Sequence, residues 1–148
     1  MTDICSLNTA ALSSVQTLDE SCFADEPFAS AWWHKAVDER GAAAWLCWRG
    51  EQLAGYCLFS RVLDEAELLR VATAPAARRQ GVGIALLQHA EQALRADGIE
   101  RLLLEVRQSN RSAQALYQKL GWQTIARRKD YYPHPDGYED ALIYQRTL

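Results

Sequence analysis

The sequence predicts an α+β fold in which a mixed, mostly antiparallel sheet carries helices on both faces. Apolar segments with short turns between them follow one another over residues 42–73, which is typical of consecutive antiparallel strands. A strand, a helix and a strand follow over residues 66–106, and such a crossover connects parallel strands. Helical segments also flank these strands on both sides in the chain. All 148 residues are expected to form one domain, 1–148.

The first forty residues are expected to form a short strand and two helices. Residues 1–7 are a candidate strand, and the polar residues that follow can cap a helix over 10–18. Apolar side chains of that helix recur every third position, at Leu12, Val15 and Leu18. Pro27 follows two acidic residues, which is typical of a helix start, and predicts a second helix over 28–38.

The remaining elements follow from turn residues and apolar spacing. Gly50 and Glu51 separate two apolar strands, 42–49 and 51–60, and so predict a β-hairpin. A turn over 62–66 leads into a strand over 66–73. The later elements are a helix over 81–96, a strand over 99–106, a helix over 111–120, and closing strands over 122–128 and 139–145 around a loop at 131–138.

Composition and charge exclude several classes of protein. The net charge of -3 argues against general nucleic-acid binding, which usually shows a basic face. The four cysteines and three histidines have no metal-ligand spacing, so we expect reduced thiols and no metal. Cys57 has no flanking histidine and is interpreted as a buried thiol rather than an acyl-carrying nucleophile. The start of the chain lacks signal-peptide features, and no apolar run reaches membrane-spanning length. We therefore expect a cytoplasmic protein without direct contact with nucleic acid or membrane. As a separate expectation, which composition does not decide, the protein is taken as a monomer or weak dimer.

The segment Arg78-Arg79-Gln80-Gly81-Val82-Gly83 joins the strand over 66–73 to the helix over 81–96. Glycines before a helix let a ligand approach backbone N–H groups that have no partner within the helix, and these groups attract anions such as phosphate. The alternative is a turn whose glycines serve packing only. A Walker loop is excluded because Val82-Gly83-Ile84 stands where Gly-Lys-Ser/Thr is needed. The three-glycine dinucleotide fingerprint is absent after this strand.

Three residues downstream of this loop are candidates for chemistry. Glu105 lies within an apolar strand, where a carboxylate is costly unless it is paired or functional. Its structural alternative is an ion pair with Arg107 or Arg70. Tyr117 lies on the helix over 111–120 and is either a core residue or a proton donor. Asn110 is expected to cap that helix, and a capping amide can also reach a ligand.

Taken together, these motifs resemble the GNAT family of N-acetyltransferases. The loop Arg78–Gly83 is similar to the family's pyrophosphate loop, Gln/Arg-x-x-Gly-x-Gly/Ala. The run from Leu104 to Trp122 is similar to Leu-Glu-Val-Arg-x-Ser-Asn-x-x-Ala-x-x-Leu-Tyr-x-x-x-Gly-Phe. With the segments 128–133 and 136–141, this pattern is most similar to members that acetylate the N-terminal alanine of the eighteenth small-subunit ribosomal protein. Other protein N-termini, lysines or small amines remain alternative substrates, and a non-catalytic module that senses coenzyme A is the alternative from another class.

The resemblance implies acetyl-CoA as co-substrate, with Glu105 as general base and Tyr117 as general acid. The cofactor-binding residues that it implies are Leu69, Val71, Arg78, Arg79, Gln80, Gly81, Val82, Gly83, Ile84, Asn110 and Tyr117. The substrate-binding candidates are Arg70, Tyr131, Tyr132, Asp136 and Glu139. A bulge is expected near residues 69–71, where the strands must splay to admit the pantetheine arm. Three residues depart from the family pattern: Ala74 where Asp is common, Arg70 where a smaller or neutral residue is frequent, and, as a mild change, Trp122 where the pattern has Phe.

Overall fold

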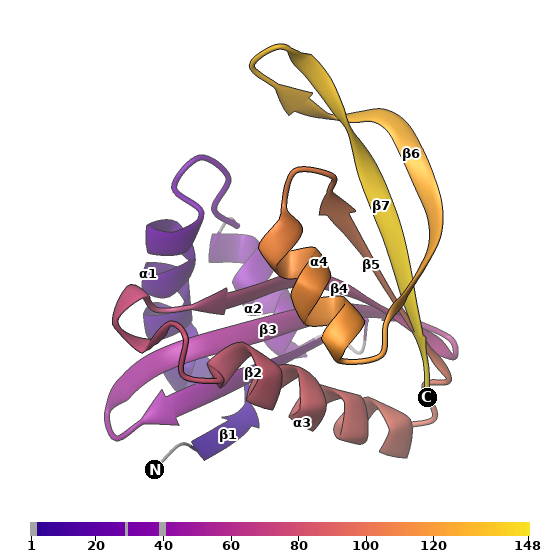
Figure 1. Cartoon of the computed structure of the whole chain (residues 1–148). Coiled ribbons are helices and arrows are strands. Elements are labelled where there is room, and N and C mark those ends of the chain that lie inside the picture. The colour runs from indigo at the N-terminus through magenta and orange to yellow at the C-terminus, as the bar shows by residue number, and fades with distance from the viewer. Residues whose placement is uncertain (1–2, 29, 39–40) are drawn as a thin grey trace.

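The computed structural model describes residues 3–28, 30–38 and 41–148, which form a seven-stranded sheet with helices (Figure 1). The strands are β1 (Asp3–Ser6), β2 (Ala42–Arg49), β3 (Gln52–Val62), β4 (Glu65–Thr73), β5 (Arg101–Arg107), β6 (Gln123–His134) and β7 (Gly137–Thr147). The helices are α1 (Leu12–Cys22), α2 (Ser30–Asp38), α3 (Val82–Ala96) and α4 (Arg111–Lys119), with short 3₁₀ turns η1 (Thr9–Ala11) and η2 (Pro75–Ala77).

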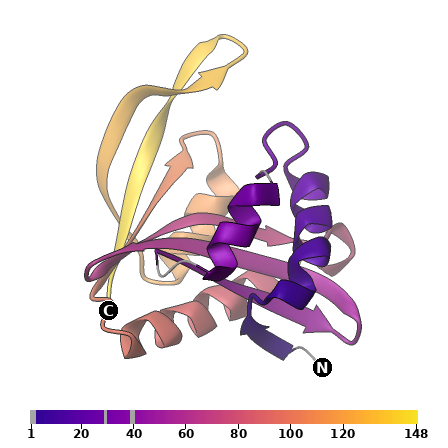
Figure 2. The same ribbon diagram turned by 180° about the vertical axis from the view of Figure 1, so that it is seen from behind.

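The sheet is mixed, as predicted, with the strand order β1-β2-β3-β4-β5-β7-β6. Strands β4 and β5 pair in parallel through the crossover helix α3, while the other described pairs are antiparallel. The predicted helices on both faces are also confirmed. Helices α3 and α4 lie on one face in Figure 1, and α1 and α2 lie on the other in Figure 2. Each face has its own core of buried apolar side chains.

The last two strands are longer than predicted, and the loop expected at 131–138 is wrong. Strands β6 and β7 form one hairpin that stands away from the body of the fold (Figure 1). The turn is short because Gly137 adopts φ +125°, which glycine tolerates. A bulge between Arg128 and Tyr132 lets β6 continue past the predicted strand end. Part of the predicted first strand, residues 1–2, lies outside the described residues, as does residue 29 of the predicted second helix.

Strands β4 and β5 separate partway along their length. Their register runs from Glu65 paired with Arg101 to Leu68 paired with Leu104. Against β3, Phe59 pairs with Leu68 and Leu58 pairs with Arg70, so Leu69 is an extra residue in β4. A bulge of this kind bends the strand. The predicted bulge is therefore confirmed, and it marks the point where β4 leaves β5 and leads toward the glycine loop.

Two sequence predictions, on membrane-spanning segments and on the cysteines, can also be compared with the described residues. None of their helices is both long and apolar enough to cross a membrane. The four cysteines are unpaired, and Cys57 is completely buried. Burial raises the pKa of the Cys57 thiol to about 12, which supports its interpretation as a packing residue because the thiol stays protonated near neutral pH.

Candidate functional site

The glycine loop after β4 has an unusual backbone. Arg79 adopts φ +62° and Gly81 adopts φ +80°, so two of the three residues 79–81 have a left-handed backbone conformation. Gly81 is the N-cap of α3, and a Cβ atom added there would touch nothing within 4 Å. The glycine at this position therefore serves the backbone conformation and not close packing. The side chain of Arg78 donates from Nε to the Thr73 carbonyl at 3.2 Å, which ties the loop back to β4.

The loop ends in a set of backbone donors at the start of α3. Ala85 N–H donates to the Gly81 carbonyl at 3.0 Å and so forms the first turn of the helix. The N–H groups of residues 82–84 precede that bond and lie at the positive end of the helix dipole. The space over Gly83 is open, since a Cβ atom there would come no closer than 4.0 Å to Thr73 Oγ1. This end of α3 can therefore accept an anionic group such as a pyrophosphate.

Glu105 projects from β5 into a group of side chains supplied by β6. Its carboxylate lies 3.4 Å from Arg128 Nε. A hydrogen bond from Tyr131 to the same carboxylate raises the pKa of Tyr131. Burial, and then the charge of Glu105, raise the pKa of Tyr132 to about 12. The structure thus brings together Glu105 and two of the predicted substrate-binding residues.

The ion pairs predicted as alternatives for Glu105 are wrong. Arg107 lies 3.4 Å from Glu139, and Arg70 lies 2.8 Å from Asp19. Glu105 pairs instead with Arg128, whose side chain is about half exposed. Arg128 belongs to β6, which is positioned by its long-range pairing with β7. The spacing of residues along β5 alone could therefore not have identified Arg128 as the partner of Glu105.

Tyr117 lies in α4 on the opposite side of the sheet from Glu105. Its ring packs against Trp122 and Tyr144, with centroids 5.8 Å and 6.2 Å away. Burial raises the pKa of Tyr117 to about 12, so its hydroxyl keeps its proton across the neutral range. Asn110 caps α4 as predicted, since its Oδ1 accepts from Ala113 N–H at 3.2 Å.

The two predicted catalytic residues lie on opposite faces of the sheet. Leu104 and Val106 lie in the core shared with Tyr117 on the α3–α4 side. The alternation along β5 turns Glu105 toward the other face. Parallel pairing stops at Leu68 and Leu104, one residue before Glu105. The arrangement allows two ligands to approach one point from opposite sides of the sheet.

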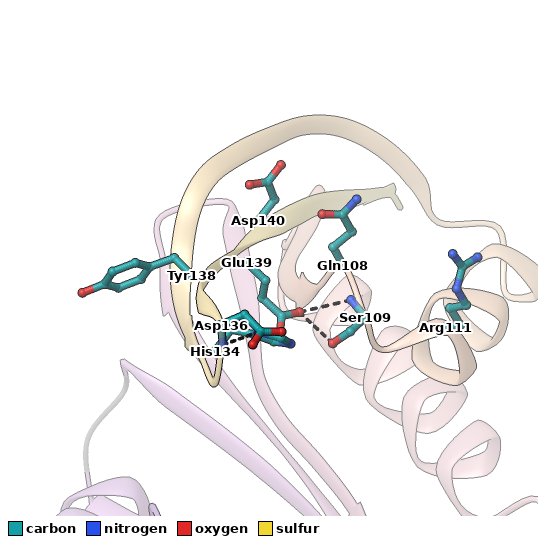
Figure 3. Close-up of a pocket in the computed structure, with 8 residues that line it drawn as sticks. All are labelled: Gln108, Ser109, Arg111, His134, Asp136, Tyr138, Glu139 and Asp140. Carbon is teal, nitrogen blue, oxygen red and sulfur yellow. Dashed lines mark hydrogen bonds and ion pairs between the residues drawn. The ribbon is translucent and has the colours of Figure 1, made fainter.

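The β6–β7 hairpin and the β5–α4 loop enclose a polar surface hollow of about 570 Å³ (Figure 3). It is lined by Gln108, Ser109, Arg111, His134, Asp136, Tyr138, Glu139 and Asp140. Glu139 accepts hydrogen bonds from Ser109 Oγ at 2.7 Å and Ser109 N–H at 3.1 Å. These bonds lower the pKa of Glu139. The hollow therefore contains two predicted substrate-binding residues, Asp136 and Glu139.

Two functional candidates were not predicted. Glu67 on β4 pairs in register with Leu103, so it shares the face of Glu105. Partial burial and the charge of Glu105 raise the pKa of Glu67. Asp19 in α1 is completely buried and holds Arg70. Two signals in the sequence could have identified these residues. They are the alternation along β4 for Glu67, and for Asp19 its position four residues after Val15, on the apolar stripe of its helix. The substrate contact predicted for Arg70 stays a prediction.

The fold, the glycine loop and the split between β4 and β5 together define the class of protein. The sequence profile of the Acetyltransferase (GNAT) family matches residues 8–122, which is more than half of the chain. The chain belongs to this family. Among the described residues, no group of three or more histidine, cysteine, aspartate or glutamate side chains is arranged to hold a metal ion.

Relatives of this chain with similar sequences are named as N-acetyltransferases. The [ribosomal protein bS18]-alanine N-acetyltransferase of Escherichia coli K12 is 46% identical over 92 residues, and the match spans 62% of each sequence. A putative enzyme of that name from Bacillus subtilis 168 is 34% identical over 137 residues, which cover 93% of this chain and 89% of the relative.

Solved structures agree with the sequence relatives. The crystal structure of the E. coli ribosomal-protein-S18-alanine N-acetyltransferase superposes with a TM-score of 0.89 at 33% identity, covering 100% of this chain and 94% of that one. Arabidopsis thaliana NAA60 in complex with acetyl-CoA has a TM-score of 0.87 at 15% identity, covering 100% and 99% of the two chains. The second likeness concerns the fold alone.

Proposed function

We propose that this protein transfers the acetyl group of acetyl-CoA to the N-terminal α-amine of an alanine-first protein, the eighteenth small-subunit ribosomal protein. One observation carries the proposal. The β4–β5 pairing ends at Leu68 and Leu104, with Glu105 on one face of the opening and buried Tyr117 on the other. An acyl transfer needs a proton acceptor beside the amine and a proton donor beside the leaving group. The sequence relatives named for this reaction support the same assignment.

Acetyl-CoA fits the α3–α4 face of the sheet. The backbone N–H groups of residues 79–84 are proposed to hold the pyrophosphate, with the positive charge of Arg78 or Arg79 nearby. The open space over Gly83 is suited to this close approach. Asn110 is proposed to contact the pantetheine arm from the start of α4, while Leu69 and Val71 border it along β4. When bound, the thioester supplies an activated acetyl group for attack by an amine.

Glu105 and Tyr117 are proposed to move the two protons of the reaction. An α-ammonium group has a pKa of about 8, so much of it must lose a proton before it can attack at neutral pH. Glu105 accepts this proton, directly or through a water molecule. A backbone N–H of residues 69–71 stabilises the negative charge that develops on the carbonyl oxygen. Tyr117 then donates its hydroxyl proton to the departing thiolate.

The incoming peptide is proposed to lie between the β6–β7 hairpin and the opening of the sheet. Tyr131 and Tyr132 stand next to Glu105 and offer rings and hydroxyl groups for the peptide chain. Asp136 and Glu139 line the hollow beside them. Their negative charge favours a substrate with a basic residue after the first.

Release of the coenzyme A thiol from acetyl-CoA, measured in the presence of each of three amines, tests the proposal. The amines are an alanine-first basic peptide, the same peptide with a blocked N-terminus and a free lysine, and a small polyamine. We expect release with the first peptide alone. Release only with lysine or the polyamine would overturn the assignment of the α-amine. Tight binding of acetyl-CoA without thiol release in the presence of any of the amines would indicate a sensing module instead.

A further inference from the structure

Among the described residues, Asp19 is the charged residue that is buried. Both of its carboxylate oxygens accept hydrogen bonds. Oδ2 accepts from Phe28 N–H at 2.7 Å, and Oδ1 accepts from Arg70 Nη1 at 2.8 Å and from the Tyr56 hydroxyl. A buried carboxylate is costly unless paired, and these three donors offset that cost for Asp19.

Arg70 extends this network to the segment between α1 and α2. Its second terminal nitrogen donates to the Glu26 carbonyl. Its guanidinium carbon lies 4.2 Å from the centroid of the Phe23 ring and 4.0 Å from that of Phe28. A planar guanidinium suits such stacking and can donate to two acceptors at once. The segment 23–28 is therefore fastened to β4 through one arginine and one buried aspartate.

The network lies at the place where β4 leaves β5. Arg70 directly follows the bulge residue Leu69, and it pairs with Leu58, which belongs to the core on the α1–α2 side. Glu105 faces this same side of the sheet. The fastened segment 23–28 consequently borders the face from which an amine would reach the opening.

We propose that Asp19 is a positioning residue for the amine substrate: it fixes Arg70 and segment 23–28 as one wall of the peptide entrance. The inference rests on the proposed function for its kinetic consequence, since only an amine that enters from this face would be affected. Acetyl-CoA, which is assigned to the other face, should bind independently of Asp19.

Steady-state kinetics of Asp19→Asn test the inference. Asparagine keeps the size and the acceptor for Phe28 N–H but removes the charge that pairs with Arg70. We expect the peptide KM to rise at least about ten-fold, because this factor corresponds to the loss of one charge-assisted hydrogen bond. The KM for acetyl-CoA and kcat should change less than about two-fold. An unchanged peptide KM, or an equal rise in both KM values, would overturn the inference.

The matched control is Tyr56→Phe, which removes a different hydrogen bond to the same carboxylate. The contacts of Asp19 with Arg70 and Phe28 survive in this variant, so its peptide KM should stay within about two-fold of the parent even where stability falls. Arg70→Lys, which keeps the charge but loses the fork and the stacking plane, should behave like Asp19→Asn. A rise in peptide KM for Tyr56→Phe as large as that for Asp19→Asn would show a general packing defect and refute the positioning role.

Hydrogen exchange gives a readout that does not depend on catalysis. In Asp19→Asn the amide protons of residues 23–26 and 28 should exchange faster, while those of β4 stay protected and Tyr56→Phe leaves the segment unchanged. Protection of residues 23–28 that is the same in Asp19→Asn and the parent contradicts the inference. If the exchange pattern holds but no peptide is acetylated, then the proposed function has failed and the anchoring by Asp19 has not.

Discussion

The replacement Tyr117→Phe removes one hydroxyl group and keeps the ring that packs in the core. Tyr117 is only 7% exposed, and its ring contacts with Trp122 and Tyr144 remain available to phenylalanine. The free energy of unfolding should therefore change by no more than about 1 kcal/mol. Proton donation by a positioned acid contributes about 100-fold to 10,000-fold in rate, so kcat should fall by about 100-fold or more.

Thiol release at saturating acetyl-CoA and peptide measures this effect, with calorimetric binding of acetyl-CoA as a check on the folded site. Tyr144→Phe is the matched control, because Tyr144 is also a buried tyrosine and is in ring contact with Tyr117. We expect that control to keep most of its turnover. Near-parental turnover in Tyr117→Phe, or an equal loss in Tyr144→Phe, refutes the role of Tyr117 as acid.

Three further predictions concern the base, the loop and the hairpin. Glu105→Gln should lose about 100-fold in kcat at neutral pH and regain rate as pH rises past the amine pKa of about 8; an unchanged pH–rate profile removes Glu105 as base. Gly81→Ala, at φ +80°, should cost about 1 kcal/mol and raise the KM for acetyl-CoA, whereas Gly98→Ala, at φ +89° beyond the end of α3, should cost as much stability without changing that KM. Equal KM values in both variants would contradict the loop assignment. Hydrogen bonds from Ser109 lower the pKa of Glu139, so the stability that Glu139 contributes is present above its ordinary pKa and is lost as pH falls through the lowered value. Ser109→Ala removes the hydrogen bond from Ser109 Oγ and should raise the pKa of Glu139 in an NMR titration; no change would exclude that bond as a cause of the lowered pKa.

The parts of the fold that depend on local sequence were predictable. The glycine loop, the alternation along β5 and the Asn110 cap each follow from spacing within a few residues. Strands 42–49 and 66–73 were also found within one or two residues of their ends. The resemblance to the GNAT family then placed the bulge near Leu69, which no local signal marks.

The parts that depend on distant pairing were not predictable. The partner of Glu105 is Arg128 because two strand pairings, β5 with β7 and β7 with β6, set the position of Arg128 relative to β5. The hairpin continues through the predicted loop at 131–138 for the same reason. The burial of Asp19 requires Arg70, fifty-one residues later, and neither residue indicates the other in the sequence.

The central claim is that an alanine α-amine receives the acetyl group at the β4–β5 opening. Tandem mass spectrometry of the eighteenth small-subunit ribosomal protein, with a free N-terminal alanine, after incubation with this protein and acetyl-CoA, tests it most directly. The account predicts one acetyl group on the α-amine of that alanine, and none when Tyr117→Phe replaces the parent for the same short incubation. Acetyl groups only on lysine side chains, or an unmodified alanine at every time, would contradict it.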